Sequence, residues 1–339
     1  MRILRFILFS LCCFLAAKTW AQDLHYSQYW TSPLNLNPAT AGFFNGKWRA
    51  GLNSKSQWSS VTVPYQTITA FFDMQVVKRK YHRDALGLGI VLNRDQAGDS
   101  KFATTQAAVC ISYIKTLNRF NTNLISIGIQ PGIVQRSISY ASLYFDDQFN
   151  GNSYDPGLAH NENFSRSNFM YFDLGAGAHW MYQRTTSTNF SAGLGVFHLT
   201  QPGQTLFYES TVRLEIKYSG YAAIQFSAKP SLDLIPSALY MKQGPYSELM
   251  VGTQIKFVRD RHLLSYTSIN TGVFMRASDA LVLMAGFDYK KFNFALSYDV
   301  NLSRLKPASK LRGGFELSLI YVHNRAKSLR HKDIPCPIF

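Results

Sequence analysis

The feature that most constrains the fold is a strict alternation of apolar and polar residues that recurs along the chain. In "KFNFALSYDVN", Phe292, Phe294 and Leu296 alternate with Asn293 and Ser297. Successive side chains of a β-strand point to opposite faces, so this segment would have one apolar face and one polar face. The pattern predicts strands whose two faces meet different environments.

The same alternation returns in "GGFELSLIYV", in "NFMYFDLGAGAHWMYQR" and in "TVRLEIKYS", where Val212, Leu214, Ile216 and Tyr218 oppose charged residues. Several apolar faces begin or end in Tyr, Trp or Phe. Such residues form the aromatic girdle of membrane barrels at the lipid headgroups. The apolar faces therefore suit lipid, and the polar faces suit an interior.

Counting such segments between turn signals predicts about fourteen strands, many of them about 10 to 14 residues long. Strands of soluble proteins average roughly 5 to 6 residues, whereas a tilted strand needs about 9 to 11 to cross a bilayer. The predicted strands are 46–57, 65–77, 84–94, 102–116, 122–137, 167–184, 188–199, 210–226, 231–243, 246–258, 265–276, 279–289, 292–300 and 313–323.

A sheet in lipid has no water to satisfy its free edges, so it must close into a barrel. The predicted fold is an all-β, antiparallel transmembrane barrel of the bacterial outer membrane. With an even number of strands, the first strand begins and the last strand ends on the periplasmic side. The turns on that side are short, and the loops outside are longer. The longest loop, from Ser137 to Ser167, should then face outwards.

The first 21 residues read as a secretory signal, with Arg2 and Arg5 before an apolar run and Ala21 before a plausible cleavage point. A membrane anchor is the alternative, but the apolar run is shorter than the roughly 20 residues that a spanning helix needs. A lipoprotein is disfavoured because Leu11 precedes Cys12. The expected organisation is a signal over 1–21, an extended periplasmic segment over 22–45, the barrel over 46–323 and a basic periplasmic tail over 324–339.

Composition limits the partners. The formal charge is +15, and an exported basic protein meets no nucleic acid, so lipid phosphates, lipopolysaccharide or an acidic partner are the anions to consider. Cleavage would leave only Cys110 and Cys336. The alternatives are one bridge between them in an oxidising compartment or two free thiols, and two free thiols are favoured.

Fragments that resemble catalytic or ligand sites have simpler explanations. Glycine pairs such as "GAGAH" open no amphipathic helix, so strand glycines are favoured over a nucleotide loop. Ser100 in "GDS", with His331 as a conceivable base, fits a hairpin turn better than a hydrolase or a calcium loop. His179, His198 and His323 have no metal-ligand spacing and suit interior packing. No catalytic residue, cofactor or metal is expected.

The segment "HYSQYWTSPLNLNPATAGF", His25 to Phe43, fits no common element. Two prolines exclude a continuous helix, and we expect them to hold the chain extended at the periplasmic mouth, on the barrel rim or inside it. The segment would seal the barrel or dock a periplasmic component. A second candidate surface is the acidic, aromatic stretch 144–156 of the long loop. The candidate partner-binding residues are Tyr29, Trp30, Pro33, Asn37, Pro38, Asp146 and Asp147.

Several stretches together resemble the PorP/SprF-like outer-membrane proteins of the type IX secretion and gliding apparatus of Bacteroidetes. They are "QDLHYSQYWTSPLNLNPATAGF", "SQWSSVTVPYQTITAFFD", "LNRDQAGDS", "LSYDVNLSRLKPASKLRGGFELSLIY" and the ending "IPCPIF". The resemblance spans nearly the whole chain after the signal. It implies a non-enzymatic integral barrel that works with type IX secretion components.

From this resemblance we expect an accessory or anchoring component that helps export or surface attachment of secreted adhesin-like proteins. Its partners would be secretion components in the periplasm or outer membrane, a secreted adhesin and outer-membrane lipid. The alternative is a passive channel for small solutes. The tail with Arg325, Lys327, Arg330, His331 and Lys332 could dock an anionic partner or simply be solvated.

Overall fold

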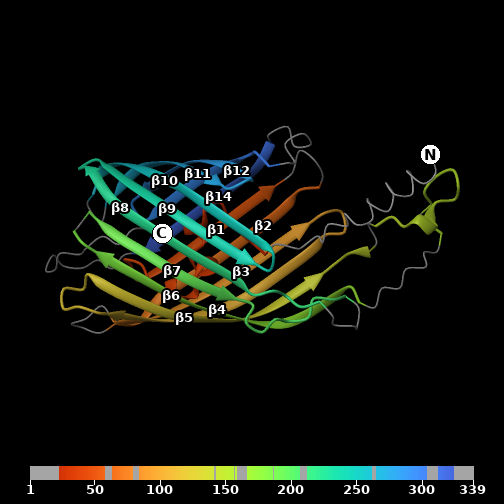
Figure 1. The fold of residues 1–339 in the computed structure, drawn as a ribbon, viewed down its shortest axis with the longest axis horizontal. Coiled ribbons are helices and arrows are strands. Elements are labelled where there is room, and N and C mark those ends of the chain that lie inside the picture. Colours follow the sequence, from red (N-terminus) through yellow and green to blue (C-terminus); the bar gives the residue numbers. More distant parts are fainter. Residues whose placement is uncertain are drawn as a thin grey trace, which may run out of the picture.

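The computed structural model contains a closed antiparallel barrel of fourteen strands, in which each strand pairs with its sequence neighbours and β1 pairs with β14 (Figure 1). The structure describes residues 23–57, 63–78, 84–140, 143–155, 157–158, 166–185, 187–206, 212–261, 265–303 and 312–323. The expected signal and tail, with Cys12, His331 and Cys336, lie outside these residues. The all-β barrel expected from the alternation is confirmed.

The strands run as follows: β1 Trp48–Gln57, β2 Tyr65–Lys78, β3 Ala85–Ala97, β4 Phe102–Thr116, β5 Asn123–Ser137, β6 Asn168–Gln183, β7 Asn189–Phe197, β8 Lys217–Lys229, β9 Leu232–Gln243, β10 Tyr246–Asp260, β11 Thr267–Arg276, β12 Ala280–Tyr289, β13 Phe292–Asn301 and β14 Arg312–His323. Most bounds lie within a few residues of those predicted, because turn residues and the two-residue period mark strand ends well.

The predicted strand 210–226 is wrong at its start. The ladder of β8 begins only at Lys217, which pairs with Phe197 and Gln243. Before it, Gly203 forms a bridge with Arg213, and the Leu214 N–H donates to the Pro202 carbonyl at 2.9 Å. The alternating residues of 212–216 thus belong to a small hairpin of the β7–β8 connection, which the two-residue period cannot distinguish from barrel wall.

The two faces of the wall follow the alternation. In β13, Phe292 and Leu296 are exposed on the outside, whereas Ser297 and Asp299 are buried inside. The same holds in β6, where Trp180 points outwards and His179 inwards. The apolar outer face is what lipid requires. No helix among the described residues is long and apolar enough to cross a membrane.

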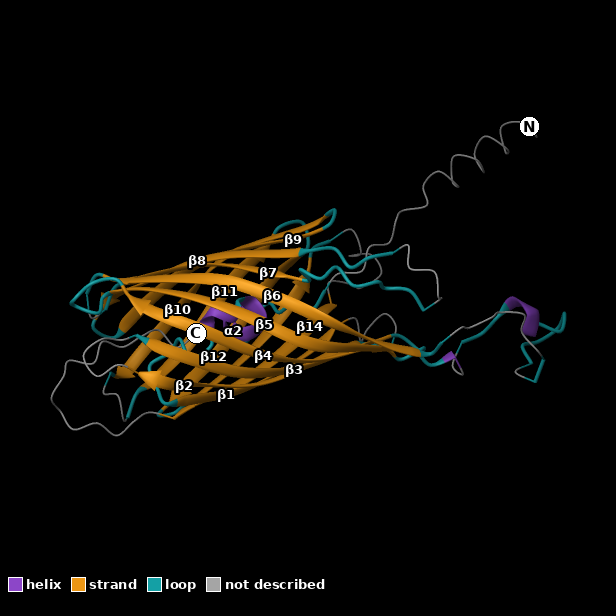
Figure 2. Cartoon of the chain, turned by 90° about the horizontal axis from the view of Figure 1, so that it is seen from below, coloured by secondary structure: helices purple, strands orange, loops and turns teal. Residues whose placement is uncertain are grey.

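The two ends of the barrel differ. The turn mouth is the end where β1 begins and β14 ends, and its connections are short, as at 230–231 and 290–291. The loop mouth is the opposite end, with the long connections 138–167 and 198–216. The first of these carries the short helix η4 (Asp146–Gln148) and projects far from the barrel, to the right in Figure 2.

A barrel of fourteen strands is too wide to be filled by its own wall side chains, as an eight-stranded barrel is. The interior is occupied instead by residues 23–46, which we call the lumen segment. Its short helix α2 (Pro33–Leu36) is visible between the strands in Figure 2. The fold therefore brings the chain before β1 into the centre of the molecule.

Candidate functional site: the lumen segment

The lumen segment is a chain of short helical turns. It contains η1 (Tyr29–Thr31), α2 and η2 (Pro38–Thr40). Pro33 and Pro38 each stand at the first position of a turn, where a missing N–H costs nothing and the fixed φ suits a helix. The expectation that these prolines hold the segment extended is therefore wrong, because each proline begins a helical turn.

The segment runs along the length of the lumen. At its start, Asp23 lies at the loop mouth, where its carboxylate is 2.9 Å from Lys217 Nζ and 3.3 Å from His198 Nε2. At its end, the Lys47 N–H donates to the His323 carbonyl at the turn mouth. The residues before β1 thus span from one mouth to the other instead of remaining at the mouth where β1 begins.

The anchor at the loop mouth is a charged cluster. His198 lies between Asp173, at 2.9 Å from Nδ1, and Asp23. Burial disfavours its cation, but hydrogen bonds and charge from the two carboxylates outweigh this and raise the His198 pKa to about 9. Burial also opposes ionisation of Asp23, yet Lys217 and His198 hold the Asp23 pKa well below its ordinary value. Both groups are therefore charged near neutral pH.

A second anchor binds the backbone of the segment. The Glu316 carboxylate of β14 accepts from the Ser27 N–H at 2.7 Å and from the Gln28 N–H at 2.9 Å. The ammonium of Lys55 lies 3.1 Å from the same carboxylate and donates to the His25 carbonyl at 3.0 Å. The contacts to Glu316 are buried, and hydrogen bonds to charged groups are the stronger kind in proteins.

A third anchor holds the last turn. The Asp73 carboxylate of β2 accepts from the Gly42 N–H at 2.8 Å and from the Arg49 guanidinium at 2.9 and 2.8 Å. Gly42 has a φ of 67°, which favours glycine, and its close approach to Gly87 of β3 leaves no room for a side chain. The wall thus fixes the point where the segment turns into β1.

Inward-facing glycines make room for the middle of the segment. A side chain at Gly177 of β6 would collide with the Asn37 amide, and one at Gly128 of β5 would come within 2.7 Å of the Ala39 backbone. In the space so provided, Asn37 Nδ2 donates to the Ala178 carbonyl at 2.8 Å. The strand glycine Gly177 of "GAGAH", like Gly128, therefore has a specific role, which is to let the lumen segment approach the wall closely.

Two apolar clusters cover the remaining length. Tyr29, Trp30 and Leu36 pack against an inward patch of β9–β12, and the Trp30 and Phe274 ring centroids are 4.9 Å apart. On the other side, Leu34 and Phe44 pack in a cluster with wall residues of β2–β4 and β14, including Cys110. The lumen wall is thus apolar where the segment is apolar, which the simple rule of a polar interior did not anticipate.

The segment also contacts the wall around its circumference. Asn35 and Asn93 of β3 exchange amide hydrogen bonds at 2.9 and 2.8 Å. Ser219 of β8 donates to the Leu36 carbonyl at 2.8 Å. Together with the contacts to β1, β5, β6, β11 and β14, these place wall contacts on all sides of the segment. The lumen segment is therefore a plug.

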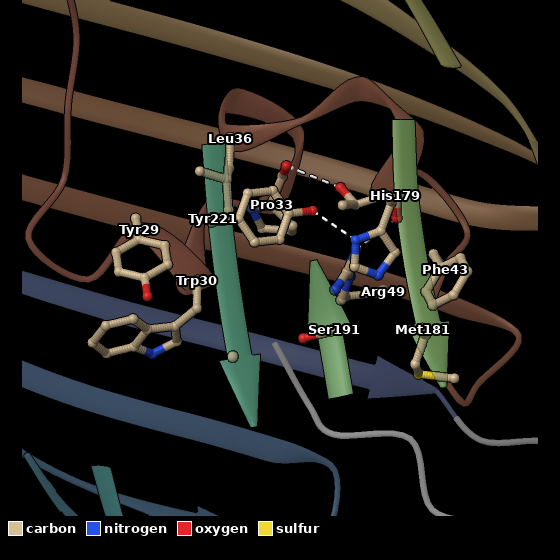
Figure 3. Close-up of a pocket in the computed structure, with 12 residues that line it drawn as sticks. Tyr29, Trp30, Pro33, Leu36, Phe43, Arg49, His179, Met181, Ser191 and Tyr221 are labelled. Carbon is tan, nitrogen blue, oxygen red and sulfur yellow. Dashed lines mark hydrogen bonds between the residues drawn. The ribbon is translucent and has the colours of Figure 1, made fainter. Parts of the chain in front are cut away.

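A cavity of about 40 Å³ remains between the plug and β6–β8, lined in part by Tyr29, Phe43, His179 and Tyr221 (Figure 3). The Tyr221 hydroxyl is hydrogen-bonded to His179 Nδ1 at 2.8 Å, and the His179 ring meets Phe43 edge to face. A cavity of this size can hold water but is much smaller than the roughly 150 Å³ that accommodates benzene. It is a packing gap in the plug.

The structure separates the candidate partner residues into two groups. Tyr29, Trp30, Pro33, Asn37 and Pro38 are buried in the lumen against the barrel wall. The other two, Asp146 and Asp147, are exposed on η4 of the long loop.

The long loop is organised by its own contacts. The buried Gln148 side chain donates to the Leu158 carbonyl and its amide oxygen accepts from Tyr154 at 3.2 Å. Tyr144 and Tyr154 stack edge to face, and Tyr144 is 77% exposed. Contacts within the loop therefore hold the segment that exposes these aromatic and acidic side chains.

The other fragments of possible chemistry lie apart. Ser100 is in the β3–β4 turn, and His179 and His198 are held by the partners described above. Among the described residues, no group of three or more His, Cys, Asp or Glu side chains could hold a metal ion. Cys110 is buried in β4, where Gln130 donates to its sulfur at 3.2 Å.

The charged wall residues that hold the plug were not identified from the sequence. They are Arg49, Lys55, Asp73, Lys217, Arg276, Asp299 and Glu316. Their signal was present, because each is a charged residue at an inward position of a strand or at its end. A charge at such a position of a barrel needs a partner in the lumen.

Two solved structures show the same fold. The toluene transporter TbuX of Ralstonia pickettii has a TM-score of 0.52 at 11% identity, over 87% of this chain and 93% of that chain. A deltaS2 mutant of the TodX monoaromatic hydrocarbon channel has a TM-score of 0.51 at 10% identity, over 87% and 94%. Among curated proteins, none matches the sequence.

One family model matches residues 19–321, and its description is "Type IX secretion system membrane protein PorP/SprF". The match includes the lumen segment and all but the last two residues of β14. With the closed barrel it places the protein in the outer membrane. The chain therefore belongs to the PorP/SprF family of type IX secretion system membrane proteins.

Proposed function

We propose that this chain is a plugged, non-enzymatic outer-membrane component that supports export or surface attachment of adhesin-like proteins by the type IX secretion machinery. The observation that carries the proposal is the lumen segment, which fills the barrel and is held by buried charges at three levels. A barrel whose lumen is occupied in this way suits a scaffold for partner proteins better than a route for solutes.

The sidedness follows from the usual topology of such barrels. The start of β1 and the end of β14 both lie at the turn mouth, which would therefore face the periplasm, and the long loop would face outwards. On this view, Asp146 and Asp147, with the exposed Tyr144, would contact a secreted protein at the cell surface. Secretion components would meet the turn mouth and the outer wall.

The test is a comparison of surface and secreted proteomes between the wild-type strain and a deletion strain. The expected result is the loss from the surface, or release into the medium, of a subset of type IX clients, restored by the wild-type gene. Complementation with D146N/D147N should restore barrel assembly but not client attachment. Unchanged export and attachment of every client in the deletion strain would contradict the proposal.

Planar-bilayer conductance distinguishes a passive channel. Wild-type protein should conduct poorly because the segment blocks the lumen, whereas a variant lacking residues 25–43 should conduct. Steady, large conductance by the intact protein would favour the channel. Lipase and protease assays on the same purified protein should give no activity above background.

A further inference from the structure

Cations cluster at one end of the barrel. At the turn mouth, the described residues include exposed basic side chains on almost every hairpin, namely Lys47, Lys115, Arg119, Arg184, Lys229, Arg259, Arg261 and Lys290. Among the acidic side chains near this mouth, Asp84 and Asp233 are almost fully buried and paired with Lys115 and Arg261, and the half-buried Asp260 accepts a hydrogen bond from Ser265. The exposed surface of this end is therefore strongly positive.

The loop mouth does not share this excess. Its exposed basic residues, such as Arg94, Lys101 and Lys242, are accompanied by exposed acidic residues. The latter include Asp99, Asp146, Asp147 and Glu215. The asymmetry is thus a property of the turn mouth and does not simply follow from the net charge of the chain.

Several cations at the turn mouth lie directly beyond outward-facing aromatic side chains of the lipid-facing wall. Lys115 follows the outward Tyr113 by two positions, so both side chains lie on the outer face of β4. At the end of β6, Arg184 follows Tyr182 in the same way.

The other side of the barrel repeats this arrangement. Arg259 follows the outward Phe257 by two positions in β10. In the β12–β13 turn, Lys290 Nζ lies 5.0 Å from the Tyr289 ring centroid. At these four places, an aromatic side chain at the end of the outer face is thus followed by a cation.

This order matches the layers of a membrane surface. Aromatic rings sit at the boundary between hydrocarbon and headgroups, and long basic side chains extend from there towards the phosphates. We propose that the basic belt, defined as Lys115, Arg184, Arg259 and Lys290 with their neighbours at the turn mouth, binds the phosphates of anionic glycerophospholipids in the leaflet on that side. The belt thereby fixes the depth and orientation of the barrel.

The lipid source follows from the topology. The start of β1 and the end of β14 both lie at the turn mouth, and in barrels of this kind that mouth faces the periplasm. The periplasmic leaflet consists of glycerophospholipids, whereas the opposite leaflet carries the phosphates of lipid A. The proposal therefore names phosphatidylglycerol and related lipids, and lipid A serves as the competing arm of the test.

The full chain is reconstituted in nanodiscs that contain equal amounts of phosphatidylglycerol and phosphatidylcholine, and native mass spectrometry counts the lipids retained on release. The wild-type protein should retain phosphatidylglycerol preferentially. Each basic side chain near an anionic surface should contribute roughly a fivefold preference at low salt. The triple variant R184Q/R259Q/K290Q should lose most of the enrichment, and added salt should weaken it in the wild-type protein.

The matched control is R94Q/K101Q/K242Q, which removes the same charge from the loop mouth and should keep the enrichment. Heat-modifiable migration on gels checks that each variant forms a barrel. If the triple variant fails to fold, R184K/R259K/K290R should retain the preference because it keeps the charges. The proposal would be overturned if wild type and triple variant retained phosphatidylglycerol equally, or if the control variant lost as much enrichment as the triple variant. Stronger retention of lipid A through the same three residues would also overturn it.

Discussion

The Arg49 guanidinium of β1 and the Asp73 carboxylate of β2 form two parallel hydrogen bonds of 2.9 and 2.8 Å in the buried lumen. The two residues are cross-strand partners in the register of these strands. The same carboxylate accepts from the Gly42 N–H, so one wall pair both neutralises itself and holds the plug.

Removal of one partner should leave the other charged and buried. Asp73→Asn or Arg49→Met should therefore lower the free energy of unfolding by about 3–5 kcal/mol, whereas Arg49→Met with Asp73→Leu should recover most of this loss. Urea unfolding of the reconstituted barrel, followed by tryptophan fluorescence, measures the difference. Single variants within about 1 kcal/mol of wild type would contradict the assignment of this pair.

A side chain at Gly177 should expel the plug without breaking the wall. The inward Gly177→Val would collide with Asn37, whereas the outward Gly220→Val on β8 lies on the lipid face and serves as the control. Gly177→Val should raise both conductance and protease cleavage within residues 25–43, with a folded barrel in both variants. If Gly177→Val shows the same low conductance and the same resistance to protease as Gly220→Val, the close approach of the segment to β6 is not required for sealing.

Trp30 anchors the plug in the apolar cluster that it forms with β9–β12. Trp30→Ala should cost about 3–5 kcal/mol, because it removes a buried ring that packs on Phe274 and leaves a cavity. Trp180→Ala removes a ring from the outer face, where lipid can fill the space, and should cost less. Unfolding free energies of the two variants in the same lipid give the comparison, and an equal cost would argue against a packed plug.

The sequence predicted the strands of the barrel wall far better than the path of the lumen segment inside it. Alternation and turn residues located β13 and β14 closely, because a strand between lipid and lumen must alternate. The plug was recognised as an unusual segment, but its path was not predicted, since it depends on pairs such as Asn37 with Gly177 that lie far apart in sequence. The apolar inward patch around Phe274 was equally hidden, because it makes sense only once Trp30 lies against it.

The loop-mouth anchor should depend on pH. The His198 pKa is raised from 6.5 to about 9, so its protonation contributes stability that is fully present below about 6.5 and is lost as the pH rises through about 9. The Asp23 pKa is lowered, so its contribution is present above its ordinary 3.8 and is lost as the pH falls through its lowered value. The start of the plug should therefore be held most firmly near pH 4 to 6.5.

Hydrogen exchange of residues 23–28, corrected for the intrinsic pH dependence, measures this hold. Protection should decrease between pH 7 and 9 in the wild-type protein and should change less in His198→Gln, which lacks the titrating group. Residues 40–44, held by Asp73, provide the internal control within the same chain. A loss of protection of the same size in both regions would point to general loosening of the barrel.

The passage of the lumen segment from the loop mouth to the turn mouth has a consequence for the order of assembly. The segment continues directly into β1, and the barrel closes where β1 pairs with β14. Glu316 of β14 holds Ser27 and Gln28, so the last strand made supplies a contact to the first residues of the described chain. The Glu316 anchor can form only once β14 is in place, so we expect the start of the plug to become fixed at the step that closes the β1–β14 seam.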